Sequence, residues 1–288
     1  MNRVRSAAVS GTWYPGSAAA LRRAVDGHLA SAEGATGKIT YAPRALIAPH
    51  AGLAYSGPVA ACAYALVRGH RYRAVVLVGP SHFVGFDGVA IWPRGAWETP
   101  LGEVAVDEVL AEAIARRDAS IREYPRAHER EHSLEMQLPF VAHVLPGVPI
   151  VPMVMGFQHR ETVDGLGLAL GRAVAMREAS GDGPVLLVAS SDLSHYLDAP
   201  RAARLDAVVA RHVEAFDPDG LMEVLEQEPS HACGGGPMVS VMRAAAALGA
   251  SRAGVLRYAD SGDVSGDKSA VVGYLAAAFW QDGRRLSC

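Results

Sequence analysis

Side chains that can bind metal or move protons follow three short apolar runs. His50 ends the run Ala-Leu-Ile-Ala-Pro-His, and His82 ends Val-Val-Leu-Val-Gly-Pro-Ser-His. A third run, Leu-Leu-Val-Ala-Ser-Ser, leads directly into Asp192 and His195. In an open α/β sheet, ligands bind beyond the carboxyl ends of the strands. We therefore expect these four side chains to form one polar cluster with metal-binding or acid–base chemistry.

Cys233 is a fifth candidate for the same cluster. It lies in His-Ala-Cys-Gly-Gly-Gly-Pro, which predicts a flexible loop that enters a helix at Pro237. A helix N-terminus lowers the pKa of a nearby thiol, and the thiolate is the form that binds metal. A single histidine or cysteine is more often structural, but their coincidence at one sheet edge favours a functional site.

One further motif matches a known metal-binding pattern. His128-Glu-Arg-Glu-His132 has the H-E-x-x-H spacing of zinc peptidases, in which one helix face carries both histidines. Pro125 lies just upstream, and helical periodicity begins only near Ser133. The motif therefore straddles a loop and a helix start, and its charges are typical of a solvated helix N-terminus. We do not expect a zinc-peptidase site here.

The elements that must position these residues alternate between strand and helix patterns, which is typical of βαβ units. The predicted strands are 44–49, 74–79, 88–92, 150–155, 185–190, 255–258 and 270–275. The predicted helices are 18–32, 59–68, 106–117, 133–144, 161–178, 201–215, 221–226 and 238–248. We expect one α/β domain over residues 1–288, with three layers and a mostly parallel mixed sheet covered by helices on both faces. The strands at 74–79 and 88–92 are close enough to pair antiparallel.

Composition excludes several classes of protein. The chain has 288 residues, is 50% hydrophobic and carries a formal net charge of −3, so it can bury a large core. No basic cluster predicts a nucleic-acid partner, and from the composition of this sequence we expect neither a signal sequence nor a membrane-spanning run. Three separated cysteines, Cys62, Cys233 and Cys288, form no disulfide framework. We expect a cytoplasmic protein.

Five motifs resemble those of a known family. They are Ala-Pro-His-Ala-Gly at 48–52, Gly-Pro-Ser-His at 79–82, Glu-His-Ser-Leu-Glu-Met-Gln-Leu-Pro at 131–139, Ser-Ser-Asp-Leu-Ser-His at 190–195 and His-Ala-Cys-Gly at 231–234. In this order and over nearly the whole chain they resemble the Memo family, whose bacterial and archaeal branch is called AmmeMemoRadiSam system protein B. The resemblance implies the fold of the class III extradiol ring-cleaving dioxygenases.

The resemblance also implies roles for individual residues. His50 and His82 match the two histidine ligands of the dioxygenases, and Cys233 stands where those enzymes have a carboxylate ligand. His195 matches their acid–base histidine. Three further residues match positions that line the pocket and would bind substrate: Trp13, Tyr55 and His132. Partners implied by the family are a radical-SAM protein and other members of the AmmeMemoRadiSam system, together with a homo-oligomer.

Three functions remain open at this point. The first is a non-haem oxidoreductase that binds O₂ and a small aromatic substrate, with His195 moving protons and Asp192 orienting it. We expect Fe(II) as its metal, as the resemblance to the dioxygenases implies. Copper is the alternative and zinc is less favoured, since a thiolate ligand softens the site. The second is a non-catalytic metal- or peptide-binding protein with a vestigial pocket. The third is a hydrolase with Cys233 as nucleophile.

Overall fold

Four parallel strands form the centre of a nine-stranded mixed sheet. The computed structural model describes residues 3–32, 41–181 and 183–282. The sheet order is β10-β12-β2-β9-β3-β8-β4-β7, with β11 paired to β12. The central strands are β2 (Ala45–Ala48), β9 (Val185–Ser190), β3 (Ala74–Pro80) and β8 (Ile150–Met155). All their residues are buried, as expected for strands covered on both faces.

Antiparallel strands extend this centre on both sides. On one side lie β12 (Val271–Trp280), β11 (Arg252–Asp260) and β10 (His195–Leu197). On the other, β4 (Val89–Ile91) pairs antiparallel with β8 and parallel with β7 (Ile121–Glu123). The predicted antiparallel pairing of 74–79 with 88–92 was wrong, because β8 lies between β3 and β4.

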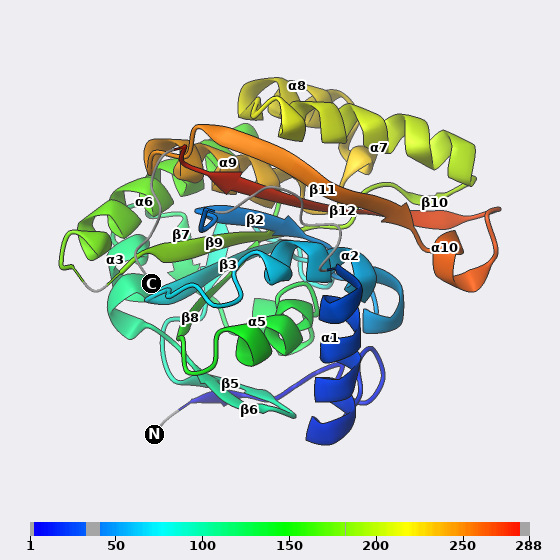
Figure 1. The fold of residues 1–288 in the computed structure, drawn as a ribbon. Helices are drawn as coiled ribbons and strands as arrows, with labels where there is room; N and C mark the ends of the chain where they lie inside the picture. The colour runs from blue at the N-terminus through cyan, green and yellow to red at the C-terminus, as the bar shows by residue number, and fades with distance from the viewer. Residues whose placement is uncertain (1–2, 33–40, 182, 283–288) are drawn as a thin grey trace.

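Helices cover both faces of the sheet, which confirms the three-layer α/β fold (Figure 1). One layer holds α1 (Ala18–Ala32), α2 (Leu53–Ala65) and α5 (Leu138–Val144). The other holds α6 (Arg160–Glu178), α7 (Ala199–Glu214), α8 (Pro218–Gln227) and α9 (Gly235–Ala247). A shorter helix, α3 (Glu108–Ala115), packs against α6. The helix α2 begins six residues earlier than predicted and contains Pro58 in its second turn, where proline lacks the N–H that would bond to the Ala54 carbonyl.

Several short elements had no clear pattern in the sequence. A second, three-stranded sheet joins β1 (Val4–Arg5), β5 (Ala96–Thr99) and β6 (Gly102–Ala105) below the main sheet in Figure 1. The predicted helix 133–144 is a 3₁₀ turn, η1 (Glu135–Gln137), followed by α5. The remaining short helices are α4 (Arg126–Glu129), η2 (Pro229–His231) and α10 (Gly262–Ser265).

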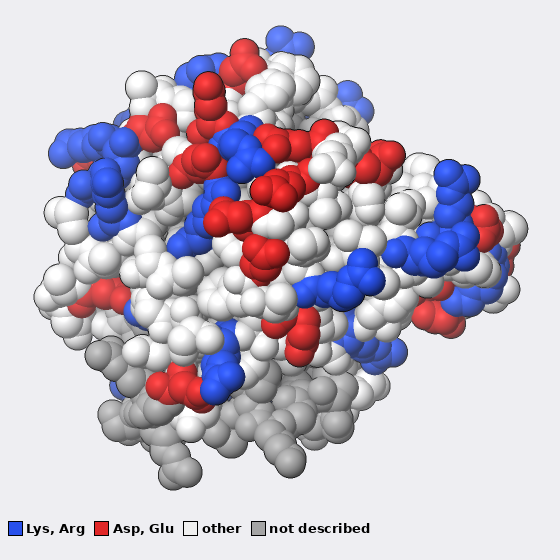
Figure 2. All heavy atoms as spheres, turned by 90° about the horizontal axis from the view of Figure 1, so that it is seen from above, with Lys and Arg blue, Asp and Glu red and all other residues white. Residues whose placement is uncertain are grey.

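The molecular surface carries mixed charge. Acidic and basic side chains are interspersed on the face seen in Figure 2. Among the described residues, no helix combines the length and apolar character that a bilayer span requires. Cys62 and Cys233 are free thiols, and Cys288 lies outside the described residues.

Candidate metal centre

Three histidines from separate parts of the chain meet at the carboxyl edge of the central strands. His50 lies two residues beyond β2, His82 lies two residues beyond β3, and His132 comes from the connection between α4 and η1. One ligand atom from each lies within 4.8 Å of the others. The His82 and His132 rings stack with centroids 4.5 Å apart, and the His50 ring is 5.2 Å from His82. The strand-end expectation thus holds for His50 and His82, and the structure adds His132.

The hydrogen bonds of Ser190 fix the tautomer of His50. Its hydroxyl donates to the Ser133 carbonyl at 2.6 Å and accepts from Gln137 Nε2 at 2.7 Å. Since its only proton is used, it accepts from His50 Nδ1 at 2.9 Å. The unprotonated Nε2 is then left as the donor atom for a metal. Burial lowers the pKa of His50 to about 3, so the ring is neutral at pH 7.

Glu131 orients His82 in the same way. Its Oε1 accepts from His82 Nδ1 at 2.9 Å, and its Oε2 accepts from the His82 backbone N–H at 2.6 Å. Backbone amides of His132 and Ser133 donate to the same carboxylate at 2.9 Å. Burial by itself would raise the pKa of Glu131, but these hydrogen bonds, led by that from the His82 ring, lower it to about 2. A carboxylate behind a histidine is the usual support of a metal ligand.

His132 is held by packing. Its ring lies 4.3 Å from the Trp13 ring, and its buried Nδ1 lies 3.6 Å from Glu131 Oε1, just beyond hydrogen-bond distance. Burial, with the neighbouring His50, lowers its pKa to about 3. The segment that carries it packs directly on the end of β3, where a Cβ on Gly79 would lie 2.8 Å from Ser133 Oγ. His132 is a candidate ligand because its ring lies beside those of His50 and His82.

A cavity of about 540 Å³ opens onto the three histidines. Trp13 and Tyr55 line it, and these two residues are 39% and 43% exposed to solvent. Tyr196 also lines the cavity, and its backbone adopts a positive φ of 60°. The predicted pocket residues Trp13, Tyr55 and His132 therefore share one cavity with the histidine site. Exposed aromatic walls suit a flat or apolar ligand.

Cys233 lies beside the site rather than in its open cavity. Its Sγ is 3.3 Å from His50 Nε2 and accepts the backbone N–H of Asp192 at 3.3 Å. It lines a neighbouring cavity of about 560 Å³, between the loop after β8 and the helix α8. Burial, with nearby Asp192, raises the pKa of its thiol, the opposite of the shift expected at a helix N-terminus. Its predicted role as a metal ligand stays a prediction.

The glycines after Cys233 form no flexible surface loop. Gly234, Gly235 and Gly236 are buried, and a Cβ on Gly234 would lie 2.4 Å from the Ser190 carbonyl oxygen. Their amides are bonded inside the protein: Gly234 N donates to Ser191 Oγ, Gly235 N to the Ala232 carbonyl and Gly236 N to Gln158 Oε1. The expected surface loop was wrong, because these glycines allow the chain to pack tightly against β9.

Asp192 and His195 both line the histidine cavity, but no hydrogen bond joins them among the described residues. Asp192 Oδ1 accepts the backbone N–H of His50 at 2.7 Å, and burial raises its pKa to about 6. The carboxylate that contacts the turn carrying His195 belongs to buried Asp206 on α7. It accepts the Ser194 N–H at 3.0 Å and the Tyr258 hydroxyl at 2.8 Å. Asp192 thus holds the backbone of His50, and Asp206 supports the turn that presents His195.

The two histidines of the H-E-x-x-H motif lie in different surroundings. As predicted, they do not share one helix face. The helix α4 ends at Glu129, before His132. His128 is fully buried, with its ring centroid 5.7 Å from that of Trp92 and 5.8 Å from that of Trp97. The solvated character expected of this segment holds for Glu129 and Arg130, which are exposed, but was wrong for His128 and Glu131, which are buried.

A second buried polar cluster lies beneath the site. Glu135 forms an ion pair with Arg5 and accepts the Tyr14 hydroxyl at 2.7 Å and the backbone amides of Ala8 and Val9 at 2.8 and 3.0 Å. Arg5 also donates to the carbonyls of His128 and Glu131 at 3.0 and 2.6 Å. We call Arg5, Tyr14 and Glu135 the Glu135 cluster. It ties the N-terminal segment, including Trp13, to the segment that carries His132.

Glu131, Ser190 and Asp206 were not singled out from the sequence. Glu131 and Ser190 lie inside the quoted motifs, but the rings that they support, those of His82 and His50, belong to other motifs, so the sequence alone did not pair them. Asp206 lies within a helical pattern with nothing in the sequence to mark it.

Comparison with known proteins gives a consistent result. The family model described as Memo-like protein matches residues 5–278. The chain is 39% identical over 277 residues to MEMO1 family protein MTH_45 of Methanothermobacter thermautotrophicus, which covers 94% of this chain and 98% of that protein. It is 35% identical over 286 residues to a MEMO1 family protein of Sulfurisphaera tokodaii, covering 96% and 99% of the two chains. A MEMO1 family protein of Thermotoga maritima is 38% identical over 239 residues, or 83% of each chain.

Proposed function

Because this chain belongs to the Memo family, we propose that it is a non-haem metal-dependent oxidoreductase, similar to a dioxygenase, that acts on a small aromatic substrate. The observation that carries the proposal is the convergence of His50, His82 and His132 within 4.8 Å at the floor of an aromatic-walled cavity. Fe(II) is the proposed metal, with copper as the alternative and zinc behind both.

The donor set fits a first-row transition metal. Imidazole nitrogens suit iron, copper and zinc. The pKa values of His50 and His132, both about 3, keep these rings neutral at pH 7, so their lone pairs are free. Ser190 and Glu131 fix two of the rings through Nδ1. His50, His82 and His132 would hold the metal, and Cys233 is placed next to His50 as a further donor.

A bound Fe(II) would supply a Lewis acid and a one-electron redox centre for substrate and O₂. The protein's own residues have separate tasks. Trp13 and Tyr55 bind and orient an aromatic ring over the histidines. His195 accepts or donates a proton at its imidazole nitrogen, from a turn that Asp206 holds in place. Asp192 keeps the His50 backbone fixed.

The contacts favour this proposal over a cysteine-dependent hydrolase. That chemistry needs a thiolate and free amides for an oxyanion. Burial raises the pKa of the Cys233 thiol. The glycine amides that follow it already donate to protein acceptors.

Anaerobic purification, metal analysis and oxygen uptake with a panel of catechols test the proposal. We expect one iron per chain and catechol-dependent oxygen uptake, both lost in His82→Ala and retained in the control His128→Phe. Metal without turnover would instead support a non-catalytic binding protein with a vestigial pocket. Absence of metal, with rapid alkylation of Cys233, would support the hydrolase.

A further inference from the structure

A second cavity adjoins the histidine cavity on the far side of Trp13. It has a volume of about 700 Å³ and lies between the N-terminal segment and the helices α1 and α2. Thr12, Trp13 and Ala54 line both cavities, so they form a shared wall. Trp13 is 39% exposed. A ligand with its ring against the histidines would have to pass Trp13 to enter the second cavity, which we call the Arg23 cavity.

The Arg23 cavity has an unusual charge balance. Arg23 is its charged lining residue, and none of the described residues that line it is Asp or Glu. Within the described chain, Arg23 makes no ion pair. Asp26, one turn further along α1, hydrogen-bonds to His143 Nε2 at 2.7 Å and does not line the cavity. His28 lines it too, but burial lowers its pKa, so it is neutral at pH 7.

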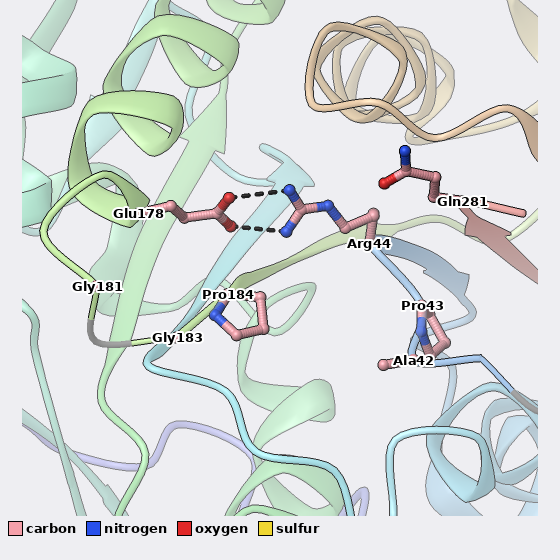
Figure 3. Close-up of a pocket in the computed structure, with 8 residues that line it drawn as sticks. All are labelled: Ala42, Pro43, Arg44, Glu178, Gly181, Gly183, Pro184 and Gln281. Carbon is pink, nitrogen blue, oxygen red and sulfur yellow. Dashed lines mark hydrogen bonds and ion pairs between the residues drawn. The ribbon is translucent and has the colours of Figure 1, made fainter. Parts of the chain in front are cut away.

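Three arginines of the other cavities are neutralised, whereas Arg172, which lines the cavity between α6 and α9, makes no ion pair among the described residues. Figure 3 shows Arg44 with its guanidinium against the Glu178 carboxylate, joined by two hydrogen bonds of 2.8 and 2.9 Å. Arg160 pairs with Glu226 in the cavity beside Cys233. Arg243 pairs with Asp164 and Asp219 between α6 and α9. Against these, the guanidinium of Arg23 is available to a ligand.

We propose that Arg23 binds a carboxylate at the distal end of the substrate, which makes the substrate class a small aromatic acid. The inference rests on the proposed function, because it assigns the far end of a ligand whose ring lies at the histidine site. One guanidinium matches one carboxylate through two parallel hydrogen bonds. A doubly charged phosphate would call for a second cation, and the described lining of the Arg23 cavity offers none.

Binding of matched compounds tests the assignment. Titration calorimetry on the metal-loaded protein, without oxygen, compares 3-(3,4-dihydroxyphenyl)propanoate with catechol, and benzoate with phenyl phosphate. We expect the parent to bind the propanoate, whose carboxylate stands clear of the ring, about tenfold more tightly than catechol, as charge-assisted hydrogen bonds imply. Arg23→Gln should abolish that difference and leave catechol affinity unchanged. Arg22→Gln, which removes the neighbouring exposed arginine outside this cavity, should preserve the difference.

Three results would overturn the inference: equal affinity of the parent for the two catechols, equal losses in Arg22→Gln and Arg23→Gln, or tighter binding of phenyl phosphate than of benzoate. These results are separable from failure of the proposed function. If affinity does not depend on the ligand's carboxylate but catechol is still turned over, only the assignment of Arg23 is wrong. Charge-dependent binding without oxygen uptake removes the oxidoreductase and leaves the anion site.

Discussion

The histidine site and the Glu135 cluster share one segment of chain but differ in how their polar atoms are used. In the Glu135 cluster, the carboxylate accepts four donors from the protein, and Arg5 donates to two carbonyls besides. In the histidine site, Ser190 and Glu131 also have their hydrogen bonds made within the protein, but ring nitrogens of the histidines remain that could bind a ligand. A closed cluster fixes the fold, and an open one is free to bind.

Removing Glu135 tests the closed side of this comparison and should have the largest effect. Glu135→Ala leaves Arg5 buried without its carboxylate, so the free energy of unfolding should fall by about 3–5 kcal/mol. Urea denaturation of the metal-free protein measures this. Glu112→Ala, which breaks an exposed ion pair with Arg116, should cost less than about 1 kcal/mol. Similar losses in both would show that the cluster contributes no more than surface charge.

Removing a ring tests the open side. His132→Ala should lower iron affinity at least about 100-fold, more than the loss of a supporting hydrogen bond typically costs. Unfolding of the metal-free protein should change far less than in Glu135→Ala. Competition with a chelator gives the affinity. Unchanged iron binding would mean that His132 only lines the pocket, as the sequence suggested.

Ser190→Ala asks whether a supporting residue behaves as part of the open site. The variant removes the acceptor for His50 Nδ1, and we expect a 10–100-fold loss of iron affinity. Ser240→Ala is the matched control, since Ser240 is equally buried and its hydroxyl donates to the Val163 carbonyl far from any metal-site histidine. Equal stability losses with unequal iron affinity would separate support of the site from support of the fold.

The central sheet could be read from the sequence because its strands are apolar at nearly every position. The parallel core β2, β9, β3 and β8 follows from that pattern, and it places His50 and His82 at one edge. The β1–β5–β6 sheet could not be read, since strands of two to four residues carry too short a pattern. The order of β3, β8 and β4 depends on long-range pairing that local sequence does not encode.

The candidate site was foreseen in its parts but not in its connections. A charged stretch such as 128–135 is normally solvated, but here Glu131 and Glu135 are buried, because His82 donates to the first carboxylate and Arg5 pairs with the second. Asp192 looked like the partner of His195 because only two residues separate them. The backbone instead turns Asp192 toward the His50 amide, and Asp206 reaches the His195 turn from α7.

Cys233→Ala tests whether the open site extends beyond three histidines. With Sγ 3.3 Å from His50 Nε2, a ligand role predicts about a tenfold or larger loss of metal affinity. Cys62→Ala is the control, because Cys62 is buried in α2 away from the site. Metal content measured after dialysis should fall in the first variant only. Identical retention in both would leave Cys233 as a packing residue.

His128 gives the smallest effect and contrasts most directly with His132, four residues away in the same motif. Burial lowers the pKa of His128 to about 3, so the folded protein keeps it neutral while the unfolded chain takes up a proton near pH 6.5. Its contribution to stability is therefore full above pH 6.5 and is lost as the pH falls toward 3. Between pH 7 and 6 the parent should lose about 0.7 kcal/mol more than His128→Phe, measured by urea denaturation of the metal-free proteins. Iron affinity should be the same in both at pH 7. A parallel decline of the two proteins would mean that His128 is protonated inside the fold, and the sealed histidine would then resemble the open one.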